Sequence, residues 1–158
     1  MKRKFLSANQ KEGAFFFESR PLQPMVRPDR LARMPPLRVA MWSGPRNIST
    51  AMLRAWGNRA DTAVVDEPLY AFYLQATGKD HPGAVEITAT GETDWRKVVA
   101  SLTNAALAEK PIFYQKQMTH HLLPEIERGW LTSLTNCFLI RDPADVIVSY
   151  LKKNDDPT

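Results

Sequence analysis

Short apolar segments alternate with segments of helical periodicity along most of the chain. The apolar segments are bounded by turn-forming or charged residues and predict buried strands at 37–42, 62–68, 111–116 and 135–140. Apolar residues spaced three or four positions apart predict helices at 47–58, 94–109, 120–128 and 142–153. Strands that alternate with helices indicate an α/β domain with a mainly parallel sheet of four or more strands, flanked by helices. We expect both faces of these strands to be buried.

Polar residues support two of the predicted helix starts and mark one irregular region. Asp94 and Asp142 are suited to accept hydrogen bonds from the first free N–H groups of their helices, and Pro143 suits a first turn. Residues 69–93 contain three glycines and a proline. They predict an insertion or a substrate-facing loop that is helical in its first part.

Residues 1–36 show no sustained periodicity and contain five prolines. We expect a disordered or loosely attached leader, followed by a domain at 37–158. Three explanations compete for this leader. It is an organelle transit peptide, a tether to an anionic surface, or translated sequence upstream of a true start at Met34. Its three acidic residues argue against a transit peptide. We favour the start at Met34, because the regular pattern begins just after it.

Charge and composition exclude several functions. The net charge of +4 comes from residues 1–36, which carry eight Lys or Arg against three Asp or Glu, so we expect no nucleic-acid partner for the domain. No apolar run approaches the roughly 20 residues of a membrane span, and we expect no membrane partner. The single cysteine, Cys137, lies in an apolar run and predicts a buried, reduced thiol in a cytoplasmic protein. No spacing typical of metal ligands occurs, so we expect no metal.

The segment SGPRNIST, at 43–50, joins the first predicted strand to its helix. Free N–H groups and the helix dipole converge at such a junction and form a site for phosphate or sulfate. Arg46 adds a positive charge, while Ser49 and Thr50 add hydroxyl donors. The alternative is that Ser49 or Thr50 only caps the helix after an ordinary turn. The segment does not match the Walker A pattern.

A second segment, FLIRDPADVIVSY, places Arg141 at a strand end and Ser149 two turns into the following helix. Because both segments follow predicted parallel strands, both lie at the edge of the sheet where ligands of such folds bind. The alternative is that Arg141 pairs with Asp142 or Asp145 while Ser149 faces solvent.

Together the two segments resemble the cofactor signatures of P-loop sulfotransferases, which use 3′-phosphoadenosine 5′-phosphosulfate. Residues 45–50 stand where that family has P-[KR]-S-G-[ST]-T, and residues 141–150 match R-[ND]-P-x-D-[VA]-x-x-S-[YF] throughout. The resemblance implies a P-loop NTPase-like three-layer sandwich. It also implies sulfuryl transfer from that nucleotide to a hydroxyl or amine of a small-molecule acceptor.

The resemblance implies roles for single residues. Arg46 would contact the bridging oxygen and stabilise the leaving phosphate, and Ser49 and Thr50 would hold the 5′-phosphosulfate. Arg141 and Ser149 would hold the 3′-phosphate, for which a bidentate guanidinium is well suited. The cofactor site implied in this way consists of Gly44, Pro45, Arg46, Asn47, Ile48, Ser49, Thr50, Arg141 and Ser149.

Sulfuryl transfer also needs a base for the acceptor. Glu67, in an Asp-Glu-Pro step at the end of the second predicted strand, resembles the glutamate base of the carbohydrate-directed branch of the family. Asp66 is the adjacent alternative. A strand-end carboxylate that is hydrated or paired with an arginine is the other interpretation.

A second source of catalytic groups is the segment KQMTHHLLP, at 116–124, which resembles the K-T-H-L-P segment of the cytosolic branch. Lys116 matches the lysine that acts at the transfer site in that branch. Met118 stands at the histidine position, so the base is not matched. We expect one of the two following histidines, His120 or His121, to reach the site, and we take His120 as the candidate.

The sequence also departs from the family pattern. Asn47 replaces the usual serine and Ile48 the usual glycine, and a β-branched residue there is expected to narrow the loop or to exclude a left-handed φ. Family domains continue well past the second signature, so we expect this sequence to be a fragment or a truncated product. Two other functions therefore stay open: a P-loop nucleotide kinase or hydrolase, and an inactive phosphate-binding domain.

Overall fold

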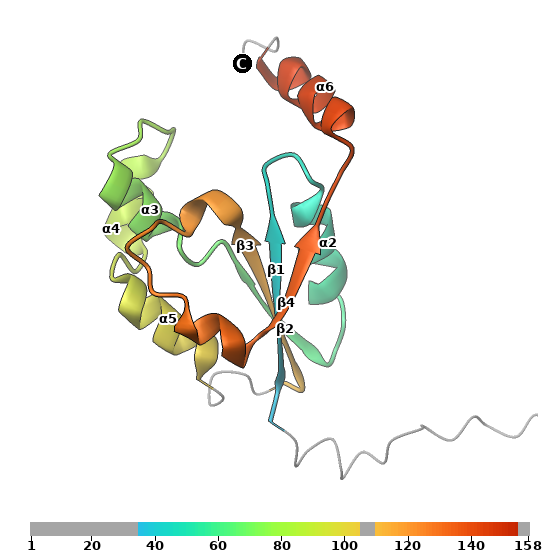
Figure 1. Ribbon diagram of the computed structural model, residues 1–158, viewed down its shortest axis with the longest axis vertical. Coiled ribbons are helices and arrows are strands. Elements are labelled where there is room, and N and C mark those ends of the chain that lie inside the picture. Colours follow the sequence, from blue (N-terminus) through green and yellow to red (C-terminus); the bar gives the residue numbers. More distant parts are fainter. Residues whose placement is uncertain (1–34, 105–109, 155–158) are drawn as a thin grey trace, which may run out of the picture.

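The computed structural model describes residues 35–104 and 110–154, and its four strands form one parallel sheet in the order β2-β3-β1-β4 (Figure 1). The α/β fold predicted from the sequence is confirmed. Ser43, at the end of β1, pairs with Met118 of β3 and Leu139 of β4, so three strand ends meet at one edge of the sheet. The strands are β1 (Leu37–Ser43), β2 (Thr62–Asp66), β3 (Ile112–Met118) and β4 (Thr135–Leu139).

Helices cover both faces of this sheet and give the expected three-layer sandwich (Figure 1). On one face, Trp56 of α2 stacks on Tyr114 of β3 with ring centroids 5.2 Å apart. On the other face, Gln115 of β3 donates its Nε2 to the backbone oxygen of Leu102 in α5, at 2.9 Å. The last helix, α6, continues beyond the carboxyl end of β4 (Figure 1). The helices are α2 (Ser49–Gly57), α3 (Tyr70–Thr77), α4 (Ala84–Thr90), α5 (Trp95–Thr103) and α6 (Pro143–Asn154).

The expectation that every strand is buried on both faces is wrong for the two edge strands. The central strands β1 and β3 contain Ala40 and Tyr114, which are fully buried. The outer strands β2 and β4 are less covered, and Val64 is 41% and Phe138 69% exposed. Cys137 lies on β4 and is for the same reason only half-buried, not buried as predicted.

The two predicted capping residues act as expected. The side chains of Asp94 and Asp142 accept hydrogen bonds from the backbone N–H groups two residues further on, at 2.9 and 2.8 Å. α5 ends at Thr103, earlier than predicted, because Asn104 has an extended backbone. The last turn of that predicted helix, at 105–109, and the predicted leader up to residue 34 lie outside the described residues.

Residues 69–93, which the sequence predicts to be mostly irregular, form α3 and α4. The prediction of a helix in the first part is confirmed by α3. The prediction that the rest is irregular is wrong, because α4 forms there. The glycines that suggest a loop stand at helix ends instead. Gly78 ends α3 at φ 60° and Gly83 precedes α4 at φ 79°, conformations that glycine adopts without a steric penalty.

The prediction of a short helix at 120–128 is wrong. A 3₁₀ turn, η2 (Thr119–His121), is followed by irregular backbone and a second 3₁₀ turn, η3 (Gly129–Ser133). The guanidinium of Arg128 donates to three backbone oxygens, and a helix over 120–128 would use two of them, those of Leu122 and Leu123, for its own hydrogen bonds. Pro124 adds to the effect, because the residue before a proline avoids the helical region. The three acceptors are Leu122, Leu123 and Ile126.

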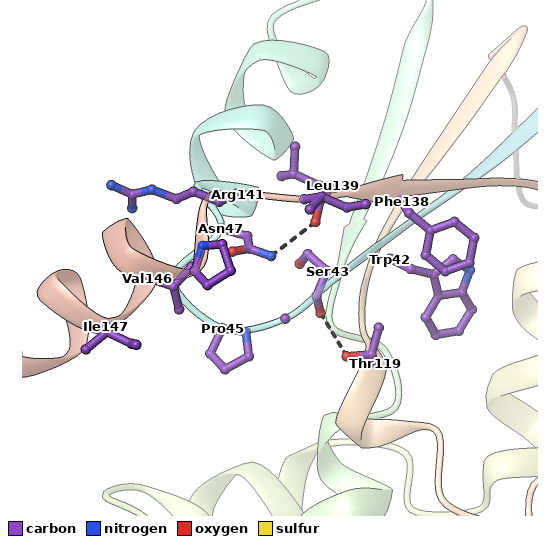
Figure 2. Close-up of a pocket in the computed structure, with 13 residues that line it drawn as sticks. Trp42, Ser43, Pro45, Asn47, Thr119, Phe138, Leu139, Arg141, Val146 and Ile147 are labelled. Atoms are coloured by element: carbon purple, nitrogen blue, oxygen red, sulfur yellow. Dashed lines mark hydrogen bonds between the residues drawn. The ribbon is translucent and has the colours of Figure 1, made fainter.

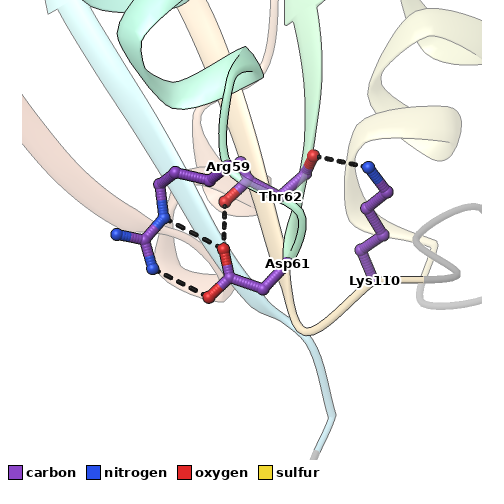
Figure 3. A network of polar contacts seen from close by, with 4 residues as sticks. All are labelled: Arg59, Asp61, Thr62 and Lys110. Atoms are coloured by element: carbon purple, nitrogen blue, oxygen red, sulfur yellow. Dashed lines mark hydrogen bonds and ion pairs between the residues drawn. The ribbon is translucent and has the colours of Figure 1, made fainter.

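A polar network lies where the chain enters β2, near the start of β3 (Figure 3). Arg59 donates to both carboxylate oxygens of Asp61, at 2.7 and 3.0 Å, and this contact lowers the pKa of Asp61. Lys110 donates its Nζ to the backbone oxygen of Thr62, at 3.1 Å. This bond ties the residues before β3 to the first residue of β2.

Candidate active site

Residues 44–48 connect β1 to α2 in a loop with two non-glycine residues at positive φ. Arg46 has φ 63°, and Ile48, the residue before α2, has φ 55°. The expectation that Ile48 excludes a left-handed φ is therefore wrong. Ile48 is itself the capping residue and makes no side-chain cap, so the interpretation of Ser49 or Thr50 as the helix cap is wrong as well. Such backbone strain costs roughly 1–3 kcal/mol per residue and is typical of binding and active sites.

This loop forms one wall of a pocket of about 260 Å³ at the carboxyl edge of the sheet, here called the anion pocket. Seven of the nine residues expected to bind the cofactor line it, while Gly44 and Pro45 line the neighbouring pocket. The lining offers two guanidinium groups, three hydroxyl groups and no carboxylate, and the start of α2 adds free backbone N–H groups. This donor set suits a multiply charged anion. The lining residues are Arg46, Asn47, Ile48, Ser49, Thr50, Arg141 and Ser149.

Hydrogen bonds join the two sequence segments at this pocket. The Nε of Arg46 donates to the Oγ of Ser149 at 2.9 Å, and the Nη1 of Arg141 donates to the backbone oxygen of Arg46 at 3.1 Å. The Nε of Arg141 also lies 3.7 Å from the Oδ2 of Asp145, so the ion pair considered as the alternative exists. Ser149, however, is bonded to Arg46 and does not merely face solvent. The structure thus brings the two segments into direct contact.

A second cluster lies where β2 and β3 end. The Nζ of Lys116 is 2.8 Å from the Oδ1 of Asp66 and 2.6 Å from the Oε1 of Glu67, and the lysine side chain is only 5% exposed. Burial by itself lowers the pKa of Lys116, but the hydrogen bonds to the two carboxylates outweigh it and the pKa lies above its ordinary value. Lys116 is therefore a buried cation that holds both carboxylates. Glu67 itself stands at φ 42°, the third strained non-glycine residue of the described chain.

The two histidines after β3 have different surroundings. His121 is 2% exposed and stacks on Tyr70 with ring centroids 4.9 Å apart, and its Nδ1 is buried with no hydrogen-bond partner among the described residues. Burial, with smaller contributions from His120 and Lys116, lowers the pKa of His121 to about 3. His121 is therefore a neutral core residue at pH 7. His120 is exposed, with its ring edge-on to Tyr73 at 5.3 Å, so it is the one of this pair that is open to a ligand.

Glu67 and Lys116 do not line the anion pocket. Glu67 lines a separate pocket of about 480 Å³, together with Asp66, Tyr70 and Glu92 among others. β3 lies between β2, which precedes Glu67, and β1, which precedes Arg46. The ends of β2 and β1 are therefore two strand spacings apart, which is roughly 10 Å. The expected catalytic residues therefore occupy two places on one edge of the sheet.

The sequence analysis does not predict a third pocket, of about 510 Å³, which adjoins the anion pocket (Figure 2). It shares Asn47 and Arg141 with the anion pocket, and its other walls are mainly apolar. Thr119 lies at its margin and donates its Oγ1 to the backbone oxygen of Ser43 at 3.3 Å (Figure 2). The sequence signal for this pocket is the apolar stripe of α6, on which Ile147 lines the pocket and is still 59% exposed.

Within 35–104 and 110–154, no three His, Cys, Asp or Glu side chains are grouped so that they could hold a metal ion. Across the same residues, no helix combines the length and the apolar character that crossing a bilayer requires.

The sheet, its flanking helices and the loop after β1 define the class of the protein, a P-loop NTPase-like α/β sandwich whose first strand–loop–helix junction is suited to a phosphate-type anion. Within that class, residues 37–158 match the sulfotransferase domain. The chain therefore belongs to the sulfotransferase domain family.

Two curated relatives come from Arabidopsis thaliana. The branched-chain-amino-acid aminotransferase-like proteins 1 and 2 are 34% and 32% identical to this chain over 111 residues. The alignment covers 70% of this chain and 20% of each relative, so the chain spans about a fifth of their length. The names of these relatives refer to whole proteins, most of whose length has no counterpart in the alignment.

Proposed function

We propose that the chain binds 3′-phosphoadenosine 5′-phosphosulfate in the anion pocket and transfers its sulfuryl group to a hydroxyl or amine of a small acceptor. The observation that carries this proposal is the convergence of two distant sequence segments on one pocket with two arginines and no carboxylate. Membership of the sulfotransferase domain family supports the reaction type. The sequence contains one cysteine and therefore no internal disulfide, which is in keeping with the cytoplasm as the place where it acts.

In this proposal each arginine serves one end of the nucleotide. Arg46, with Ser49, Thr50 and the free N–H groups of α2, holds the 5′-phosphosulfate, and its charge offsets the negative charge that develops on the leaving phosphate. Arg141 and Ser149 hold the 3′-phosphate. Because Ser149 is bonded to Arg46, both residues exchange that hydrogen bond for phosphate oxygens when the nucleotide binds.

The donor supplies the sulfuryl group: a bond forms from the acceptor to sulfur, the bond from sulfur to the bridging oxygen breaks, and adenosine 3′,5′-bisphosphate leaves. Glu67 takes the proton that the acceptor loses. Lys116 acts by holding Glu67 at the end of β2, because its ammonium is buried against the carboxylates. His120 is the alternative base, and a pH–rate profile of Glu67→Gln beside His120→Gln assigns the proton acceptor.

The alternative of a nucleotide kinase or hydrolase has less support. Such an enzyme needs a lysine in the first loop, where Arg46 stands. It also needs a free carboxylate for magnesium, and Asp66 is bonded to Lys116. Magnesium-dependent turnover of ATP would establish this alternative instead.

The test is the thermal and chemical stability of the 158-residue chain with and without adenosine 3′,5′-bisphosphate. Ligand at about 100 times its Kd adds roughly 2.7 kcal/mol to the free energy of unfolding. We expect this gain for the wild type and for Arg54→Ala, an exposed arginine of α2 outside the anion pocket, but not for Arg141→Ala. A folded wild type that gains nothing would mean that the pocket does not bind this nucleotide, and the proposal would fail in favour of an inactive domain.

A further inference from the structure

The loop of the anion pocket needs support from outside itself. Arg46 and Ile48 stand at φ 63° and 55°, and Ile48 is the less tolerant of the two, because its β-branched side chain crowds the backbone there. Ile48 is 61% exposed, and its side chain therefore gains little packing energy to offset the strain. Such a conformation persists only where the surrounding structure holds it.

Two hydrogen bonds join the loop to the end of β4 and to the residues that follow it. Asn47, between the two strained residues, donates its Nδ2 to the backbone oxygen of Leu139 at 3.1 Å (Figure 2). Arg141 donates its Nη1 to the backbone oxygen of Arg46 at 3.1 Å. The two bonds therefore fix the strained loop at two adjacent residues, Arg46 and Asn47. The Oδ1 of Asn47 is buried with no partner among the described residues, so the contribution of this side chain comes from the Nδ2 bond.

We propose that Asn47 is a positioning residue, whose hydrogen bond to Leu139 keeps Ile48 at positive φ and the adjoining N–H groups directed into the anion pocket. Where the bound anion is the nucleotide phosphosulfate, this inference rests on the proposed function. Asn47 and Ile48 are the two positions at which this loop departs from the family signature. In this proposal the two departures compensate each other. The side-chain amide of Asn47 keeps Ile48 in a left-handed conformation, which a glycine at position 48 would adopt without such a bond.

The test is a double-mutant cycle in the full chain, with titration calorimetry of adenosine 3′,5′-bisphosphate. We expect Asn47→Ala to weaken binding about tenfold, because Ile48 then relaxes and the N–H groups turn away. In an Ile48→Gly background the same change should cost no more than about twofold. The control is Thr132→Ala, which also removes a side-chain bond to a backbone oxygen, from Oγ1 to Gly129 at 2.8 Å, but outside the pocket, and should leave the affinity unchanged. Equal losses in both backgrounds, or no loss at all, would overturn the proposal.

A ligand-free measurement separates this inference from the proposed function. The backbone chemical shifts of Ile48 report its φ, and we expect left-handed values in the wild type and a change toward negative φ in Asn47→Ala. A positive φ that survives in Asn47→Ala would refute the positioning role, whatever the nucleotide does. If φ changes as expected but adenosine 3′,5′-bisphosphate binds no variant, the proposed function fails and the role of Asn47 stands.

Discussion

The Nε of Arg46 donates a hydrogen bond of 2.9 Å to the Oγ of Ser149, which lies 103 residues further along the chain. In the proposed function these residues bind different phosphates of one nucleotide, so their hydrogen bond joins the two halves of the site in the absence of ligand. The contact is exposed to solvent, and exchanging it for phosphate oxygens therefore costs little. The bond thus holds the two halves of the pocket near each other without a ligand.

We expect Ser149→Ala to weaken the binding of adenosine 3′,5′-bisphosphate about tenfold, because a hydrogen bond to a charged group contributes about 1.5 kcal/mol. The unfolding free energy should hardly change, since the bond to Arg46 is exposed. Titration calorimetry measures the first quantity and urea denaturation the second. Ser133→Ala, which removes an exposed hydroxyl bonded to the backbone oxygen of Trp130, is the matched control. An unchanged affinity in Ser149→Ala would mean that Ser149 does not contact the nucleotide.

We expect Lys116→Met to lower the free energy of unfolding by about 1–3 kcal/mol, because it removes two charge-assisted hydrogen bonds. The loss stays moderate because Asp66 and Glu67, with side chains 52% and 26% exposed, remain hydrated. Urea denaturation measures it. Lys97→Met removes a lysine that is 70% exposed and 3.8 Å from its partner Glu92, and should change stability by less than about 0.5 kcal/mol. A Lys116→Met protein as stable as the wild type would show that the burial of the ammonium cancels the gain from the pair.

The convergence of residues 43–50 and 138–150 on one pocket could be predicted from the sequence, because the rule that parallel strands end at one edge turns local motifs into a spatial prediction. Arg46 and Arg141 lie far apart in sequence, yet the order of strands and helices is enough to bring them together. The capping residue Asp142 is likewise a local signal, and the structure confirms it.

The parts that could not be predicted depend on individual side-chain contacts and on the strand order, which the apolar periodicity does not encode. Arg128 takes two backbone oxygens that the expected helix at 120–128 would need, and the apolar periodicity of the segment does not indicate this, although Pro124 is a local signal against the helix. The separation of Glu67 from Arg46 follows from the position of β3 between their strands, and the strand order is a tertiary property. The left-handed φ of Ile48 contradicts its local preference, because bonds from the end of β4 override it.

The buried His121 predicts a dependence of stability on pH. Its pKa is about 3 in the folded state and about 6.5 when unfolded, so the unfolded chain takes up the proton first as the pH falls. The stabilisation is complete above about pH 6.5 and is lost between 6.5 and 3, by up to about 1.4 kcal/mol per pH unit. Urea denaturation at pH 7 and pH 5 should show a smaller loss for His121→Phe, which keeps a ring against Tyr70. His81→Gln, at an exposed histidine, should retain the wild-type loss, and an equal loss in His121→Phe would contradict the assignment.

Adding a side chain at Gly91 tests how closely α3 packs against the end of α4. A Cβ at this position would lie 2.6 Å from the Cβ of Ala71 and 2.8 Å from the backbone oxygen of Ile87, and a backbone atom cannot move aside cheaply. We expect Gly91→Ala to lower the free energy of unfolding by about 1–3 kcal/mol, as overpacking does. Gly129→Ala, where a Cβ meets nothing within 4 Å, is the control and should leave stability nearly unchanged. Equal stability of the two variants in urea denaturation would mean that α3 and α4 do not pack as closely as described.

Ile48→Gly should make the protein more stable, which is the reverse of the usual effect of introducing a glycine. It relieves a strain of roughly 1–3 kcal/mol and costs roughly 0.5–1 kcal/mol in unfolded-chain entropy, so we expect a net gain of about 1 kcal/mol. Ile48 is 61% exposed, and little packing is lost with its side chain. Ile140→Gly is the matched control, because Ile140 is 85% exposed and is not at positive φ; it should lose stability by the entropy term alone. If urea denaturation shows that both glycine variants are less stable than the wild type, Ile48 does not carry the strain that its backbone indicates.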